Sequence, residues 1–159
     1  PNSPQFQRKM TMLPTVQKAY DDVLFMLEDF LRKVPDDKWY TGCDEYLIPV
    51  RITYHMLASF EWLTTKLPFE EHLKARRFGM NWQGPVEGMP SREEVLAAIP
   101  WLRELVAGWI ADWAKYEPGS EEYRVHLEDA LYWMRHIQHH MGELSVLSRL
   151  LQFDAPEWR

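Results

Sequence analysis

Cysteine is almost absent from this sequence. Cys43 is the only cysteine among 159 residues, so neither an intramolecular disulfide nor a cysteine-based zinc site can form. Such a chain suits a reducing compartment, and we therefore expect a cytoplasmic protein. Cys43 lies between two expected helices, where we interpret it as an ordinary small residue. The alternative, a reactive thiol, would require a lowered pKa.

Positive charge and long hydrophobic runs are also scarce. The formal net charge is −6, and the only cluster of basic residues is the short stretch 74–77. Proteins that bind nucleic acid usually present a basic face, so we expect no nucleic-acid partner. The most apolar stretch, residues 95–114, is interrupted by charges and by Pro100, which we also expect to kink or split its helix. With polar residues at positions 1–8, we expect neither a membrane partner nor a secretory signal.

Apolar residues recur at spacings of three and four, whereas the alternation typical of strands is nowhere sustained. This pattern predicts long helices over residues 12–33, 45–67, 91–116 and 120–151. Pro35 and Pro68 follow the first two, where a proline ends a helix. Ser91 and Glu94 form a capping box at the start of the third, and Ser120 caps the fourth.

A long connection, residues 68–90, separates the second and third predicted helices. Connections of this length are unusual in compact domains unless they contain a short helix or have a function. We expect a short helix over residues 69–78. Arg76 and Arg77 should lie on the surface, or contact an anionic substrate if the connection folds over a site. The whole pattern predicts an all-α fold, a four-helix bundle that forms a single domain over residues 1–159.

Three of the six histidines, His136, His139 and His140, fall within five positions. His136 and His140 are four residues apart, which places both imidazoles on one face of a helix, within reach of a single metal ion. His139 is rotated away from this face and is expected to flank the site. Asp129 and Glu143 share the face, and burying such groups is costly unless they have partners. A metal ion is the simplest common partner. The alternative is a pair of solvated or core histidines.

A third ligand must come from another helix, and His55 is the best candidate. It lies on the apolar stripe of the second predicted helix, with Ile52 and Met56. A lone histidine on such a stripe is more often a hydrogen-bonded core residue, unless it faces the histidine pair. His72 and His126 have charged neighbours, so we expect both to be solvated.

Two stretches resemble the DinB-like (YfiT-like) family of metalloproteins. They read YHMLASFEW at residues 54–62 and HIQHHMGEL at residues 136–144, and VPDDKW at residues 34–39 looks like the joint between the family's first two helices. The family's His-Arg-Gly-Gln segment reads His-Met-Gly-Glu here, at residues 140–143. The resemblance spans roughly residues 12–151, and its specificity rests on the spaced histidines.

This resemblance implies a four-helix bundle that binds one divalent ion, zinc, nickel or iron, through His55, His136 and His140. Three protein ligands would leave a coordination position open, as in catalytic sites. Glu143 would then orient a bound water, accept its proton, or form a hydrogen bond that positions a ligand histidine. The alternative is a solvated carboxylate without a role in the site. Family members include thiol S-transferases. The implied partners are therefore a low-molecular-weight thiol, an electrophilic small molecule and a second copy of the chain in a homodimer.

Three functions remain open from the sequence. The first is an enzyme that performs metal-dependent thiol transfer or metal-assisted hydrolysis. The second is a non-catalytic metal-binding or stress-related bundle protein. The third is a bundle without metal that mediates protein contacts, with each histidine satisfied by its own hydrogen bonds. An accessible pocket beside the ion distinguishes the first from the second.

Overall fold

The computed structural model describes residues 4–65, 67–77 and 81–159, and only the backbone over residues 4–11. Its helices are α1 (Pro4–Lys33), α2 (Asp36–Trp39), α3 (Pro49–Thr64), α4 (Phe69–Ala75), α5 (Arg92–Trp113) and α6 (Glu121–Leu150). The described residues contain no strand, which confirms the predicted all-α class.

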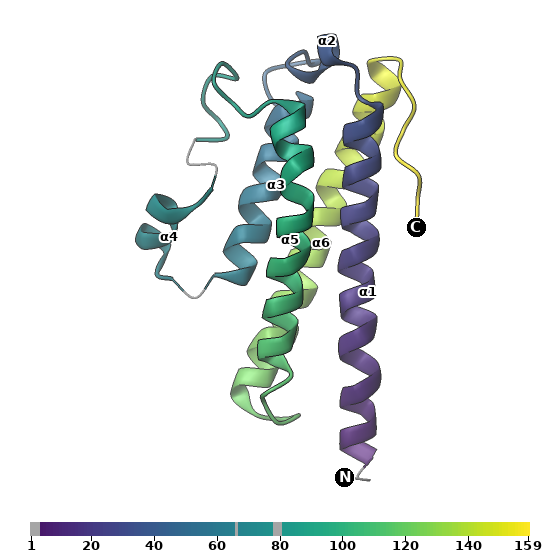
Figure 1. Ribbon diagram of the computed structural model, residues 1–159. Coiled ribbons are helices and arrows are strands. Elements are labelled where there is room, and N and C mark those ends of the chain that lie inside the picture. The colour runs from purple at the N-terminus through teal and green to yellow at the C-terminus, as the bar shows by residue number, and fades with distance from the viewer. Residues whose placement is uncertain (1–3, 66, 78–80) are drawn as a thin grey trace.

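The four long helices lie lengthwise beside one another, as Figure 1 shows. Helix α1 packs against α5 and α6, and α3 packs against the same two helices. The short α2 lies at one end of the long helices, and α4 lies beside α3. The α3–α6 contact brings together two helices that lie more than 50 residues apart in the chain.

Tyr20 of α1 joins all four long helices at one place in the core. Its ring makes edge contacts with Phe60 of α3 and Trp109 of α5, with centroids 6.4 and 6.1 Å apart. Its hydroxyl donates a hydrogen bond of 3.0 Å to the backbone oxygen of Ala130 in α6. This buried hydroxyl therefore keeps a partner, as a buried polar group requires.

The predicted helix caps are present. The Ser91 hydroxyl accepts from the Glu94 N–H at 3.2 Å, and the Glu94 carboxylate accepts from the Ser91 N–H at 2.7 Å, which confirms the capping box. Ser120 accepts from the Tyr123 N–H at 3.2 Å at the start of α6. These bonds satisfy N–H groups that have no partner within the helix.

Some helix boundaries differ from the predictions. Helix α3 begins at Pro49 rather than at residue 45, because the Asp44 carboxylate accepts from the N–H groups of Tyr46 and Leu47 and holds a turn there. Helix α1 begins at Pro4, earlier than predicted. Helix α5 continues through Pro100, so Pro100 does not split it; a kink there, the other expected effect, stays a prediction.

The connection between α3 and α5 contains the predicted short helix, α4, which ends at Ala75; residue 78 lies outside the described part of the chain. Cys43 is exposed in the connection between α2 and α3. Within the described residues, no helix combines the length and the apolar character needed to cross a bilayer.

Candidate metal centre

The structure brings His55 of α3 together with His136 and His140 of α6. The ring centroid of His55 lies 5.0 Å from that of His136 and 4.7 Å from that of His140. The ring centroids of His136 and His140 are 4.6 Å apart. Each residue offers one ring nitrogen, and these atoms all lie within 4.8 Å of one another. The sequence predicted this juxtaposition only through the family resemblance, because spacing alone does not relate α3 to α6.

The donor atoms fit a divalent ion. Three nitrogens around a tetrahedral zinc ion lie about 3.4 Å apart, given Zn–N distances of about 2.0–2.1 Å, a spacing that fits within the 4.8 Å limit of the cluster. The Nε2 atom of His140 is buried, and it has no hydrogen-bond partner among the described residues. A buried ring nitrogen without a partner is costly, and a metal ion would use its lone pair.

Glu143 holds His140 from the opposite side of the ring. Its Oε2 lies 2.7 Å from Nδ1 of His140. An ionised carboxylate can only accept, so in this pair Nδ1 carries the proton and the ring's lone pair is on Nε2. This is the arrangement in which a carboxylate orients a metal-binding histidine. Of the roles considered for Glu143, the geometry favours this one.

Ser59 supports the site from α3, a role that the sequence analysis missed. Its hydroxyl lies 2.9 Å from the backbone oxygen of His55 and 3.1 Å from Nε2 of His136. It therefore bridges the two helices beside the cluster. The available signal was its position four residues after His55, on the same helical face.

Burial favours the neutral form of His55 and of His136. It lowers the pKa of His55 to about 4, with further lowering by His140 and His136. Burial also lowers the pKa of His136, as do His140 and His139, while Glu143 acts in the opposite direction. Metal ions bind neutral imidazole, so these two shifts favour metal binding by His55 and His136 at neutral pH.

The long connection reaches the site through Trp82, which no sequence pattern indicated. Its ring stacks on His55 with centroids 4.3 Å apart and planes inclined by 33°. The buried Arg51 holds this segment, because its Nη1 donates to the backbone oxygens of Trp82 at 2.5 Å and Gly84 at 2.8 Å. The connection therefore shields one side of the histidine cluster.

A cavity of about 290 Å³ opens beside His55. Aromatic rings make most of its wall, and its lining comprises His55, Ala58, Ser59, Trp62, Phe69, His72, Leu73, Arg76, Trp82 and Trp133. Arg76 brings a positive charge to this wall, in line with the alternative in which the connection folds over the site. His72 is buried against Trp62, with centroids 5.0 Å apart, so its predicted solvation is wrong.

The other polar residues of α6 that the sequence analysis considered lie outside the triad formed by His55, His136 and His140. His139 is exposed and its Nε2 lies 3.3 Å from Oε1 of Glu143, so it flanks the triad as predicted. Asp129 lines a different cavity together with His126. His126 is only partly exposed and stacks on Trp109, with centroids 5.7 Å apart, so it is not the solvated residue that was predicted.

No family model, no curated protein and no solved structure matches the chain. The resemblance to the DinB-like family therefore rests on the residues quoted above, and the chemistry of the site must be argued from its own geometry.

Proposed function

We propose that the chain is a metalloprotein of the DinB-like four-helix-bundle type, which binds one divalent ion through His55, His136 and His140. The observation that carries the proposal is the buried Nε2 of His140, which lacks a partner among the described residues although the His140 ring lies in a cluster with two further imidazoles. Zinc, nickel and iron all accept three imidazole ligands.

We further propose that the site is catalytic, of the thiol S-transferase type. A divalent ion held there supplies a Lewis acid that lowers the pKa of a bound thiol. Glu143 would keep His140 in the binding tautomer, and Trp82 would exclude water from one side. The aromatic cavity beside His55 would receive the electrophilic small molecule. No nucleophile of the chain is required, which agrees with Cys43 being exposed and outside the site.

The cavity favours catalysis over a closed structural site. A structural ion has all its positions filled by protein, whereas here one of the three proposed ligands, His55, lines a cavity that could admit a substrate. Hydrolysis at the same site and a non-catalytic metal-binding role are the alternative functions, and a substrate screen of the metal-loaded protein separates them from thiol transfer.

A cytoplasmic homodimer is the proposed physiological state. Helix α6 exposes Leu131 and Tyr132, and Glu128 and Arg135 flank them at equal distances along the helix. Two antiparallel copies of α6 that cross between positions 131 and 132 would place Glu128 of each copy opposite Arg135 of the other. Such a self-complementary surface suits a twofold interface.

Metal content tests the proposal. Protein purified without a His tag or chelating resin would be analysed by plasma mass spectrometry, alongside His55→Ala, His136→Ala and His140→Ala. We expect about one ion per chain in the wild type, lost in each variant, and retained in the control His139→Ala. Absence of metal after zinc, nickel and iron are supplied would rule out the proposed site. Metal without thiol transfer to any electrophile would leave the two alternatives, hydrolysis and a non-catalytic role.

A further inference from the structure

The cavity beside His55 has tryptophan rings in its wall from three separate parts of the chain. Trp62 comes from α3, Trp82 from the connection between α4 and α5, and Trp133 from α6. All three residues are partly exposed, so each keeps some surface that the protein itself does not cover. Phe69, at the start of α4, adds a fourth aromatic side chain. The volume of about 290 Å³ is at the lower end of the range for small-molecule sites.

Contacts with neighbouring rings hold these tryptophans in place. The Trp62 ring is nearly perpendicular to that of Phe69, with centroids 5.2 Å apart. The Trp133 ring is nearly perpendicular to that of His136, with centroids 5.4 Å apart. Trp82 has its own ring contact, described above. A ligand would therefore meet rings that are already ordered, and little affinity would be lost in immobilising them.

The charges of the lining decide between two kinds of ligand that aromatic walls attract, a cation and another aromatic ring. Among the described residues, no aspartate or glutamate lines the cavity, whereas Arg76 brings a positive charge to its wall. A divalent ion at the proposed metal centre would add further positive charge. A cation would meet these charges without a carboxylate to offset them, so the lining favours an uncharged aromatic group.

The cavity adjoins the histidine cluster. His55 belongs to both. Ser59 also lines the cavity, and its hydroxyl lies 3.1 Å from Nε2 of His136. A ligand in the cavity would therefore lie against one of the proposed metal ligands, and it would not need to displace any of them.

We propose that this cavity binds an uncharged aryl group, which packs against Trp62, Trp82 and Trp133. The inference rests on the proposed function and names its substrate class, because the aryl group is then the part by which the electrophilic small molecule is recognised. Aromatic pairs are more favourable than the burial of equal apolar area alone, so the cavity prefers a flat ring to a saturated one.

Binding to the full chain in EDTA tests this preference without metal or thiol. Calorimetry and saturation-transfer NMR would compare 2-naphthylmethanol with its fully saturated analogue and with 2-naphthylmethylammonium. We expect 2-naphthylmethanol to bind at least fivefold more tightly than either. The saturated analogue is at least as hydrophobic, so a merely apolar surface would bind it equally well or better. Such a result would overturn the proposal, as would tighter binding of the ammonium or no binding of 2-naphthylmethanol at millimolar concentration.

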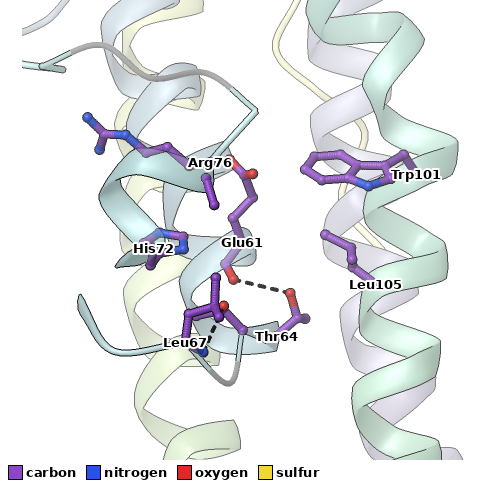
Figure 2. A pocket seen from close by; sticks show the side chains of 9 residues that line it. Glu61, Thr64, Leu67, His72, Arg76, Trp101 and Leu105 are labelled. Carbon is purple, nitrogen blue, oxygen red and sulfur yellow. Dashed lines mark hydrogen bonds between the residues drawn. The ribbon is translucent and has the colours of Figure 1, made fainter. Parts of the chain in front are cut away.

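Trp62→Leu tests the wall, because Trp62 packs on α4 and not on a ligand histidine. We expect the preference for the aryl probe to fall at least threefold, and Trp62→Phe to retain most of it. Trp101→Leu is the matched control, since Trp101 faces a different cavity, the one around Glu61 that Figure 2 shows. Ala58→Trp fills the cavity beside His55 and should abolish binding, so it decides the matter if Trp62→Leu does not fold. An unchanged preference in the folded variants would overturn the proposal.

A paramagnetic ion tests whether the aryl site adjoins the metal centre. In the nickel-loaded protein, the ring protons of 2-naphthylmethanol should relax at least threefold faster than in the zinc-loaded protein. Equal relaxation would place the bound ring away from the ion and would overturn the link to the proposed transfer. If the protein retains neither ion, the proposed function fails by itself, while binding in EDTA still decides whether the cavity selects an aryl group.

Discussion

Trp82 lies against His55, with ring centroids 4.3 Å apart, although 26 residues separate them along the chain. Arg51, one helical turn before His55, holds the backbone of Trp82 and Gly84 in this position. Helix α3 therefore supplies both the candidate ligand His55 and the side chain, Arg51, that holds the segment around Trp82 over it.

Replacing Arg51 should release the segment around Trp82 from its position over His55. Arg51→Ala removes two hydrogen bonds from a charged donor, and such bonds contribute about 1.5–3 kcal/mol each. We expect the free energy of unfolding to fall by about 3–6 kcal/mol, measured by urea denaturation. In the metal-loaded protein we expect at least tenfold faster dissociation of the ion, measured by stopped-flow transfer to a chelator. Arg149→Ala, an exposed arginine on α6, is the control. An unchanged dissociation rate in a folded Arg51→Ala variant would show that the connection does not cover the site.

Removing the Glu143 carboxylate should weaken metal binding without abolishing it. Glu143→Gln leaves the three ligand histidines in place but removes the charge that fixes the tautomer of His140. Loss of such a supporting group costs about 10–100-fold in metal affinity. Competition with a chelator of known affinity measures this change. Glu122→Gln on the same helix, exposed near its start, should bind metal like the wild type. Complete loss of metal would instead identify Glu143 as a direct ligand.

The metal-free protein should become less stable as pH falls from about 7 to about 4. The pKa of His55 is lowered to about 4 in the folded chain from an ordinary value of 6.5, chiefly by burial. Between these values the unfolded chain binds the extra proton, so acid favours unfolding, by about 1.4 kcal/mol per pH unit for each proton. Below the pKa of His55 in the folded chain, both states carry the proton, so this residue adds no further change in stability with pH.

Urea denaturation at pH 7.5 and pH 5.0 in EDTA measures this dependence. We expect the difference in unfolding free energy between the two pH values to shrink in His55→Gln. His139→Gln, which removes an exposed ring, should shrink it less. Burial raises the pKa values of Glu61 and Asp129, so these two groups make the folded chain more stable as pH falls. They are present in the wild type and in both variants, so their contribution cancels in the comparison. An equal pH dependence in wild type and His55→Gln would contradict the assigned burial of this histidine.

The sequence by itself determined the helical class, the capped starts of α5 and α6, and the placement of His136 and His140 on one face. These features depend on interactions between residues a few positions apart, so periodicity and capping patterns report them directly. Of the two effects expected at Pro100, a kink or a split, the split does not occur, because α5 accommodates the proline without ending.

Only the tertiary structure decided which distant groups meet. His55 faces the α6 pair because α3 packs on α6, and Trp82 reaches His55 because Arg51 binds its backbone. The buried carboxylate of Glu61 likewise acquires its cavity only where α4 and α5 come close to α3. Such contacts join segments that are far apart in the chain. Their geometry follows from how whole helices pack, which no local pattern in one sequence encodes.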